Sequence, residues 1–429
     1  MIGNLSPALI VIIGAVLAPL FPWRARNVYM MALPILAAIQ LAGMDHGNFG
    51  QFEFFDYQLT TLRIDRLSFI FGLIFLLATL LGVIFALHIR DTVQQVCGLI
   101  YAGAAIGAVF AGDMITLFVY WELTAITSVF LIWASRSERS YHSGMRYLVI
   151  QVGSGVLLLA GAILYAEKYG TIAFDHLGLV DLPTAMIFVA IGIKCAFPLL
   201  HNWLQDAYPE ATVTGTVMLS AFTTKLAVYA LARGYAGTEI LIYIGAVMTA
   251  FPVFFAVIEN DLRRVLAYSL NNQLGFMVVG VGVGSELALN GTVAHAFCHI
   301  LYKALLFMSM GAVLFRTGTA KASDLGGLYK SMPWTAGFCI VGAASISAFP
   351  LFSGFISKAL ILTGTAEAGY WGVWLVLVFA SAGVLEHSGI KIPYFAFFAH
   401  DSGKRVKEAP LNMLVAMGIT AFFCIAIGV

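Results

Sequence analysis

The sequence predicts an all-α polytopic membrane protein with about 14 transmembrane helices. Hydrophobic residues make up 61% of the 429-residue chain and charged residues only 10%, too little charge to cover a soluble protein of this size. Apolar runs of roughly 17–25 residues recur along the chain, which is the length that spans a bilayer core. In lipid the backbone must satisfy its own hydrogen bonds, so we expect these runs to be helices.

The expected spans follow one another with short loops between them, and their boundaries are good to a few residues. The longest polar insert, from Met44 to Arg66, is too short for a soluble domain. The first apolar run lacks the charged start and cleavage site of a signal peptide, so we expect it to remain as a helix. In chain order the spans are residues 5–22, 28–43, 67–89, 95–112, 114–134, 145–166, 184–203, 213–234, 239–258, 262–283, 290–315, 335–364, 370–388 and 411–428.

Composition also excludes several classes of function. The net charge of +1 and the lack of a basic patch outside short loops argue against nucleic-acid binding. The five cysteines lie singly within apolar segments, without the spacing of a metal site, an iron–sulfur site or a disulfide framework. We therefore expect no cofactor and no metal, and interpret the cysteines as packing residues.

The loop lysines and arginines predict the orientation. Loops on one side of the membrane carry fifteen of them and loops on the other side four, so the positive-inside rule places the first group in the cytoplasm and both termini outside. The first group is Arg24, Arg26, Arg90, Arg136, Arg139, Arg146, Arg263, Arg264, Arg316, Lys321, Lys330, Lys391, Lys404, Arg405 and Lys407, and the second is Arg63, Arg66, Lys168 and Arg233.

The remaining basic residues are four lysines inside spans: Lys194, Lys225, Lys303 and Lys358. A charge at a helix centre costs about 2.5–3.5 kcal/mol on insertion scales, so such residues usually mark an ion or proton pathway. The alternative, a lysine that extends to the interface, is credible only for Lys358, whose depth is uncertain. Glu122, in the middle of its span, predicts a switchable pair with Lys194, because burial disfavours a charged lysine and a nearby carboxylate favours it.

Three ionisable residues recur every fourth position in one span. His295, His299 and Lys303 therefore form a polar stripe on one side of a helix. Histidine titrates near neutrality, which favours a proton relay. Two alternatives remain: a metal site, for which no third ligand is evident, and core histidines bonded to the backbone.

A short repeat links two distant spans. Residues 196–200 (AFPLL) resemble residues 348–352 (AFPLF), and a membrane lysine lies near each. An odd number of spans separates them, which predicts two inverted five-helix repeats with broken helices, as in transporters. We expect 1–94 to hold the first three helices, 95–235 the first repeat, 236–390 the second repeat, and 391–429 a cytoplasmic loop and the last helix.

Together these motifs resemble a known family. Residues 65–416 resemble the antiporter-like subunits shared by Mrp-type multisubunit cation/proton antiporters and respiratory complex I, and are most similar to the D-type subunit of the Mrp antiporters. The segments that carry the resemblance are 117–123 (LFVYWEL), 197–210 (FPLLHNWLQDAYPE), 223–225 (TTK), 259–264 (ENDLRR), 294–307 (AHAFCHILYKALLF) and 354–358 (GFISK).

The resemblance implies that Glu122 and Lys194 are a coupled pair, that Lys225 is a central lysine, and that a second-half relay ends at Lys358. Two departures stand out: Ser269 where many relatives have His, and a chain that ends at Val429 where many relatives continue, which leaves a shortened form open.

The expected function is that of a proton-translocating subunit of a multisubunit Na⁺/proton antiporter in a prokaryotic inner membrane, with other membrane subunits as partners. We expect a transporter subunit and not an enzyme, with its membership of a redox-driven translocase complex left open. The alternative is a proton-pumping subunit of a redox-driven complex of the complex I or membrane-bound hydrogenase type. A self-sufficient transporter or a subunit of an inorganic-carbon accumulation system is a third option.

The predicted orientation can be tested by cysteine labelling. In a background that lacks the native cysteines, Arg136→Cys should react with a membrane-impermeant maleimide only in inside-out vesicles, because its loop belongs to the cytoplasmic group. Lys168→Cys is the matched control and should react only in right-side-out vesicles. Labelling of position 136 from outside would overturn both the orientation and the number of spans.

Overall fold

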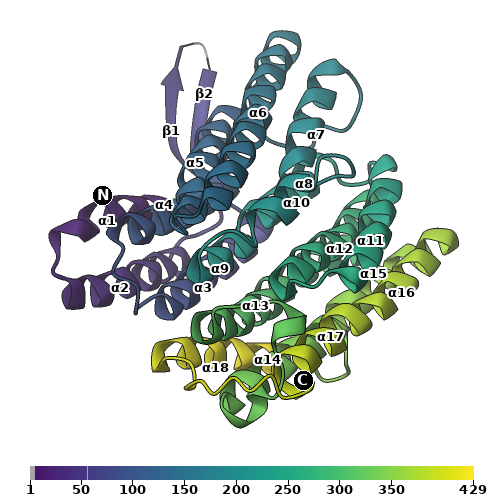
Figure 1. Ribbon diagram of the computed structural model, residues 1–429. Helices are drawn as coiled ribbons and strands as arrows, with labels where there is room; N and C mark the ends of the chain where they lie inside the picture. Colours follow the sequence, from purple (N-terminus) through teal and green to yellow (C-terminus); the bar gives the residue numbers. More distant parts are fainter. Residues whose placement is uncertain (1–4, 56) are drawn as a thin grey trace. The chain divides into compact units, whose positions relative to one another are not determined.

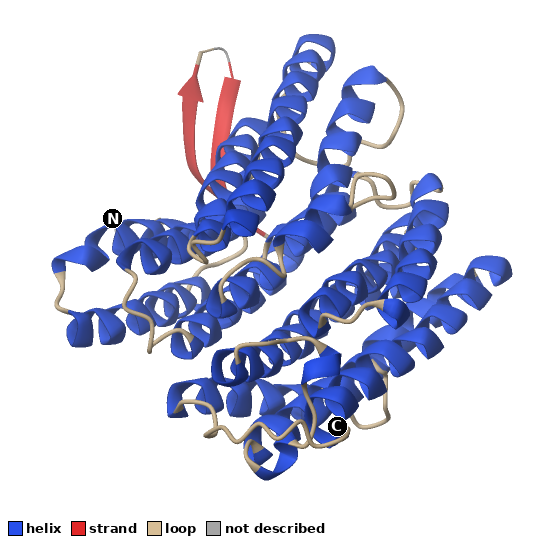
Figure 2. Ribbon diagram, in the orientation of Figure 1, coloured by secondary structure: helices blue, strands red, loops and turns tan. Residues whose placement is uncertain are grey.

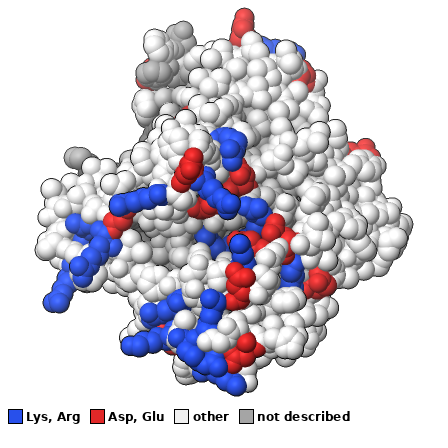
Figure 3. Space-filling view, in the orientation of Figure 1, with Lys and Arg blue, Asp and Glu red and all other residues white. Residues whose placement is uncertain are grey.

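The computed structural model describes residues 5–55 and 57–429, and a helix lies in every segment where the sequence predicts a span (Figures 1 and 2). Among these residues, nine helices are long and apolar enough to cross a membrane, and four shorter apolar helices accompany them. Wide areas of the surface in Figure 3 carry no charged side chain. A mainly helical, multi-span membrane protein is confirmed, whereas the number of crossings stays a prediction. The predicted side of the N-terminus concerns residues 1–4, outside the described residues.

The chain divides into two units, each built from separate stretches of sequence. Unit 1 comprises Met1–Val83, Ile89–Trp203 and Phe222–Ala236. In it α4 packs against α1 and α5, α6 against α5 and α7, and α10 against α4 and α7. Its elements are α1 (Pro7–Leu17), the 3-10 turn η2 (Ala18–Leu20), α2 (Trp23–Ala42), β1 (Gly47–Phe54), β2 (Tyr57–Ile64), α3 (Arg66–Phe85), α4 (Thr92–Phe110), α5 (Met114–Trp133), α6 (Glu138–Tyr169), α7 (Leu182–Lys194) and α10 (Thr223–Gly234).

Unit 2 comprises Ile84–His88, Leu204–Ala221 and Gly237–Val429. Its central helix is α13, which packs against α9, α12, α14, α15 and α18. Its elements are α8 (Asn202–Ala207, which begins in unit 1), α9 (Val213–Ala221), α11 (Ile240–Ile258), α12 (Leu262–Val283), α13 (Glu286–Thr317), η3 (Ala322–Asp324), η4 (Leu328–Lys330), α14 (Pro333–Ile346), α15 (Ser353–Glu367), α16 (Trp371–Val384), the π segment η5 (Leu385–Ile390), α17 (Lys391–Pro393), the π segment η6 (Tyr394–Phe398) and α18 (Leu411–Ala426).

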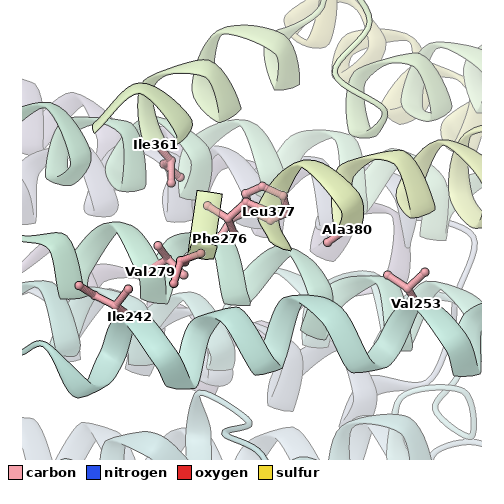
Figure 4. Close-up of a cluster of buried hydrophobic side chains, with 8 residues drawn as sticks. Ile242, Val253, Phe276, Val279, Ile361, Leu377 and Ala380 are labelled. Carbon is pink, nitrogen blue, oxygen red and sulfur yellow. The ribbon is translucent and has the colours of Figure 1, made fainter. Parts of the chain in front are cut away.

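An apolar cluster holds four helices of unit 2 together. Side chains from α11, α12, α15 and α16 meet there, among them Ile242, Phe276, Ile361 and Leu377, each with no solvent exposure (Figure 4). Their burial is the main favourable term for packing these helices. Phe276 of this cluster also contacts the ammonium group of Lys358, which is described below. The apolar cluster therefore borders the buried polar groups of unit 2.

Short polar side chains fix where the helices begin. Asp113 accepts hydrogen bonds from the Thr116 amide and hydroxyl at the start of α5, and Asp181 accepts one from the Thr184 amide at the start of α7. Such caps satisfy the N–H groups that have no partner within a helix. The Lys168 ammonium and the Tyr169 hydroxyl beside Asp181 hold the pKa of that carboxyl well below its usual range.

The polar insert Met44 to Arg66 differs from the expected loop, because strands β1 and β2 form an antiparallel hairpin there (Figure 2). The all-α prediction is wrong in this segment. The Thr60 amide donates to Asp113 at 2.8 Å, and Leu59 packs against Ala166 and Ile172, so the hairpin is attached to the helices of unit 1. Only Leu59, Leu62 and Ile64 of β2 are buried, and their irregular spacing does not stand out beside long apolar runs.

The two predicted helix breaks have the same backbone conformation. Ala196 and Leu199 have φ of 60° and 69°, and their counterparts Ala348 and Leu351 have φ of 57° and 71°. In both breaks the amide of the phenylalanine after the alanine donates to a carbonyl five residues back, at 3.0 Å. This is the Schellman ending of a helix, with alanine where glycine is usual, followed by a proline that prevents the helix from continuing.

The thirteenth span is longer than the sequence predicted. We expected it to end at residue 388 and placed Lys391 in a loop, whereas the helix continues through η5, α17 and η6 to Phe398. Lys391 lies inside this helix and is 8% exposed. Arg263, also counted as a loop residue, is in the first turn of α12 and donates to the Pro209 and Ala211 carbonyls. Two of the charges counted for orientation are therefore buried.

The left-handed residue Leu199 provides a stability test. In an ordinary helix, glycine is less stable than alanine by about 1 kcal/mol. At Leu199, which is exposed, the order should reverse, because a Cβ in the left-handed region costs about 1–2 kcal/mol. Leu199→Gly should therefore unfold at a higher temperature than Leu199→Ala in detergent. The matched pair at Ile163, an exposed position inside α6, should show the normal order; the same order at both positions would contradict the backbone assignment.

Candidate functional site

Lys194 is a fully buried charge of unit 1. It is the last residue of α7 and has no solvent exposure. Its Nζ donates to the Trp121 carbonyl at 2.7 Å and to the Thr124 hydroxyl at 2.6 Å, and lies 4.7 Å from the centroid of the Trp121 ring. Two oxygens and an aromatic face therefore replace the water that the ammonium has lost.

Glu122 follows Trp121 on α5 and is half-buried. Its charge interacts with that of Lys194, but the two side chains make no direct ion pair among the described residues. The Glu122 Oε1 atom is buried and has no hydrogen-bond partner within the described part of the chain. It lies against Gly155 of α6, where any Cβ would collide with it. The carboxylate thus occupies space that only a glycine leaves open.

Lys225 lies in the first turn of α10 with no solvent exposure. Its Nζ donates to the Thr224 hydroxyl at 3.3 Å, and its charge acts on the thiol of Cys195, which follows Lys194. The start of α10 is fixed by Tyr101 of α4, whose hydroxyl accepts the Thr223 amide at 3.0 Å. Unit 1 therefore carries Glu122, Lys194 and Lys225 on α5, α7 and α10, and Lys225 interacts with Cys195, the residue after Lys194.

The histidine stripe of unit 2 is part of a hydrogen-bonded network. His295 Nδ1 lies 2.9 Å from the Ser357 hydroxyl, and its Nε2 lies 3.3 Å from the Tyr302 hydroxyl. Tyr302 donates to Gln273 Oε1 at 3.1 Å. The imidazole thus connects α13 with α15 directly and with α12 through Tyr302.

The rest of the stripe is equally buried. His299 has no solvent exposure, and its ring centroid lies 6.1 Å from that of His295 and 5.3 Å from that of Tyr302. Lys303, one turn further, also has none. The contact between His295 and His299 agrees with the predicted stripe, and Lys303 lies one turn further along the same helix α13.

Lys358 of α15 does not extend to the interface, because it is 1% exposed. Its Nζ donates to the Ile346 carbonyl at 2.7 Å and lies 5.2 Å from the centroid of the Phe276 ring. Ile346 is the last residue of α14, so its carbonyl has no partner within the helix. The break between α14 and α15 therefore provides the acceptor for the lysine that follows it.

Sequence reasoning missed several polar residues of unit 2. Ser357 and Tyr302 contact His295, and Gln273 accepts a hydrogen bond from Tyr302, but all three are uncharged and did not stand out as membrane charges. His387 and Lys391 were missed because apolar residues become sparse near residue 388. His387 and Lys391 are four residues apart, a spacing that places two side chains on one face of a helix. This spacing was the available signal that the helix continues past residue 388. Among the described residues, no group of three or more His, Cys, Asp or Glu side chains is arranged to hold a metal ion.

Comparison with known proteins gives a family match. The family described as NADH:quinone oxidoreductase/Mrp antiporter, TM matches residues 111–384. The chain is 34% identical over 297 residues to NADH-quinone oxidoreductase subunit N of Desulforudis audaxviator, a match that covers 64% of this chain and 59% of that protein. It is 30% identical over 314 residues to the D-type subunit of the Na(+)/H(+) antiporter of Alkalihalophilus pseudofirmus, covering 68% and 63%. The chain thus spans about three-fifths of the length of these relatives.

The fold has a close counterpart among solved structures. A chain of the Mrp complex from Dietzia sp. DQ12-45-1b superposes with a TM-score of 0.85 over 99% of this chain and 93% of that one. The sequence identity is 21%, so this similarity concerns the fold alone.

The space beside Glu122 provides a packing test. Gly155→Ala should lower the free energy of unfolding by about 1–3 kcal/mol, because its Cβ has to displace the Glu122 carboxylate. Gly153→Ala on the same helix is the matched control: that position is exposed, no atom lies near an added Cβ, and stability should be unchanged or rise by up to about 1 kcal/mol. Equal thermal unfolding of the two variants in detergent would contradict the described position of the carboxylate.

Proposed function

Because the chain belongs to the NADH:quinone oxidoreductase/Mrp antiporter family of membrane subunits, we propose that it is the proton-translocating subunit of a multisubunit Na⁺/proton antiporter. Its partners are the other membrane subunits of that complex, in a prokaryotic inner membrane with both termini outside. The chain carries protons and has no catalytic centre of its own.

The observation that carries the proposal is the burial of four lysines, each 0–1% exposed, in a chain of low charge. A permanently charged lysine is expensive in a membrane, whereas one that alternates between charged and neutral forms is the expected part of a proton pathway. The ammonium groups of Lys194 and Lys358 donate to neutral oxygens, among them the Trp121 and Ile346 carbonyls. A neutral oxygen accepts a hydrogen bond from the ammonium but favours its charged form less than a carboxylate in direct contact would.

In the first half, we propose that Glu122 and Lys194 act as a switchable pair. Lys194 is charged when Glu122 is ionised, and it is free to pass its proton toward Lys225 when Glu122 is neutral. The absence of a direct ion pair between them supports this role, because a tight pair would hold both charges in place. Lys225 is the central site at which the first pathway ends.

In the second half, His295, His299, Lys303 and Lys358 form the relay. His295 is hydrogen-bonded through both ring nitrogens, to Ser357 and Tyr302, so a proton accepted on one side can leave from the other. Lys358 is the terminal lysine. The matching Schellman endings after α7 and α14 support two inverted five-helix repeats, one for each half, among about 14 transmembrane helices.

The relatives also support the second candidate, a proton-pumping subunit of a redox-driven complex. Both named relatives cover similar shares of the chain at similar identity, and one is a subunit of a quinone oxidoreductase. The same buried lysines would then transfer protons in response to electron transfer in other subunits. The driving force, either a cation gradient or electron transfer, distinguishes the two candidates.

The function can be tested in inside-out vesicles that contain the chain with its partner subunits. Added Na⁺ should drive proton movement, seen with a pH-sensitive dye, and Glu122→Gln or Lys194→Ala should abolish it while the complex still assembles. Glu138→Gln and Lys168→Ala, the same changes at exposed residues, should leave it intact.

Normal flux in Glu122→Gln or Lys194→Ala would refute the pair. Proton movement that requires an electron donor instead of Na⁺ would favour the redox-driven complex.

A further inference from the structure

A π-helical segment at the end of α16 carries a buried histidine with no role in the pathway described above. The segment η5 packs against α11, α12 and α14, and His387 within it has no solvent exposure. A π turn is rare, holds one residue more than an α turn, and is frequent at functional sites. A buried titratable ring in such a turn requires an explanation.

The hydrogen bonds of His387 define its protonation. Its Nδ1 lies 2.8 Å from the Ser388 hydroxyl, and Ser388 donates its only proton to the Ser269 hydroxyl of α12 at 2.9 Å. His387 Nδ1 is therefore the donor to Ser388, and Nε2 carries a lone pair. That Nε2 is buried and has no hydrogen-bond partner among the described residues. The ring thus presents an open proton acceptor inside the membrane.

The segment that carries this acceptor packs against α14, whose end forms the helix break that holds Lys358. The Ile346 carbonyl accepts the Lys358 ammonium, and the next residue, Ser347, lies against Gly389 of η5, where a Cβ would collide with the Ser347 hydroxyl. The Ser347 hydroxyl is also buried without a partner in the described part of the chain. Each of these two open polar atoms calls for bound water, and a chain of water between them would link the break that holds Lys358 to His387.

We propose that His387 is a proton-carrying side chain that connects the buried lysines of unit 2 with the membrane face formed by the turn between α11 and α12. The inference rests on the proposed function, since it adds a branch to the same pathway. Ser269 is in the second turn of α12, about 10 Å from the first residue of that helix. The hydroxyls of Ser388 and Ser269 therefore lead from His387 toward that turn.

The transfer is a sequence of proton steps without any redox change. The Lys358 ammonium loses a proton through the bridging water, and an N–H bond forms at His387 Nε2. The resulting imidazolium releases its Nδ1 proton to Ser388, whose own hydroxyl proton passes to Ser269. Ser269 is itself buried about 10 Å from the start of α12, so its proton crosses that distance to the α11–α12 face through bound water. Lys358 is left neutral, and His387 returns to a neutral form.

Lys391 has a different role, although it lies one turn after His387. Its Nζ donates to the Ala256, Val257 and Glu259 carbonyls, so all three of its N–H groups are engaged with backbone and none is directed toward His387. This charge and those of Lys303 and Lys358 act on the His387 ring. Because like charges repel, the ring holds a proton only as a neighbouring lysine gives one up.

The test separates proton transfer from a structural role. His387→Asn keeps a short amide that can bond to Ser388 but removes the acceptor at Nε2. We expect Na⁺-driven or electron-driven proton flux in the assembled complex to fall about tenfold or more, with unchanged yield and thermal stability. His142→Asn, at an exposed histidine of α6, is the matched control and should keep full flux. Ser388→Ala should lower flux, and Ser388→Thr, which keeps the hydroxyl, should preserve it.

The outcomes are distinct from those of the proposed function. If the wild-type complex shows no proton flux, both the proposed function and this inference are refuted. Normal flux in His387→Asn beside an active wild type would overturn the inference alone. A loss of flux in proportion to lost assembly or stability would assign His387 a structural role and would also overturn it.

Discussion

The structure depends on how an ammonium group is accommodated away from water. Removing an unpaired charge from water is far costlier than any single packing interaction, so each buried lysine needs oxygen atoms and space. Lys194 takes the Trp121 carbonyl, whose residue lies within a continuous helix, whereas Lys358 takes the Ile346 carbonyl, which is available because α14 ends there. Helix breaks in this protein are therefore part of the solvation of charge, in addition to interrupting a span.

The same requirement explains the aromatic rings beside the lysines. The faces of Trp121 and Phe276 lie 4.7 and 5.2 Å from the ammonium groups of Lys194 and Lys358. An aromatic face stabilises a cation and does not offer a base that would remove its proton. Such surroundings tolerate the charged and the neutral form alike, which a carboxylate in direct contact would not.

The sequence predicted the features that depend on hydrophobic contrast. Lys194, Lys225 and Lys303 stand out because apolar residues flank them, and the structure buries all three. The hairpin was missed because the polar insert lacks the regular alternation of apolar and polar residues that would predict paired strands. His387 was missed for a related reason: a π turn shifts the helical spacing by one residue, and the expected end of the span was taken from falling hydropathy.

The shortness of the broken helices has a consequence for biosynthesis. With 13 and 14 residues, α7 and α14 are about 20 Å long, less than the roughly 30 Å of a bilayer core. Each must leave the translocon with an exposed polar backbone at its end. At the end of α7, Lys194 binds the Trp121 carbonyl of α5, a helix that is synthesised earlier. After α14, the backbone of Leu351 and Phe352 packs closely against Gly428, which is synthesised later. The backbone at the break after α14 therefore stays exposed until Gly428 has been synthesised. We expect membrane chaperones to be needed in the interval between the insertion of α14 and that of the last helix.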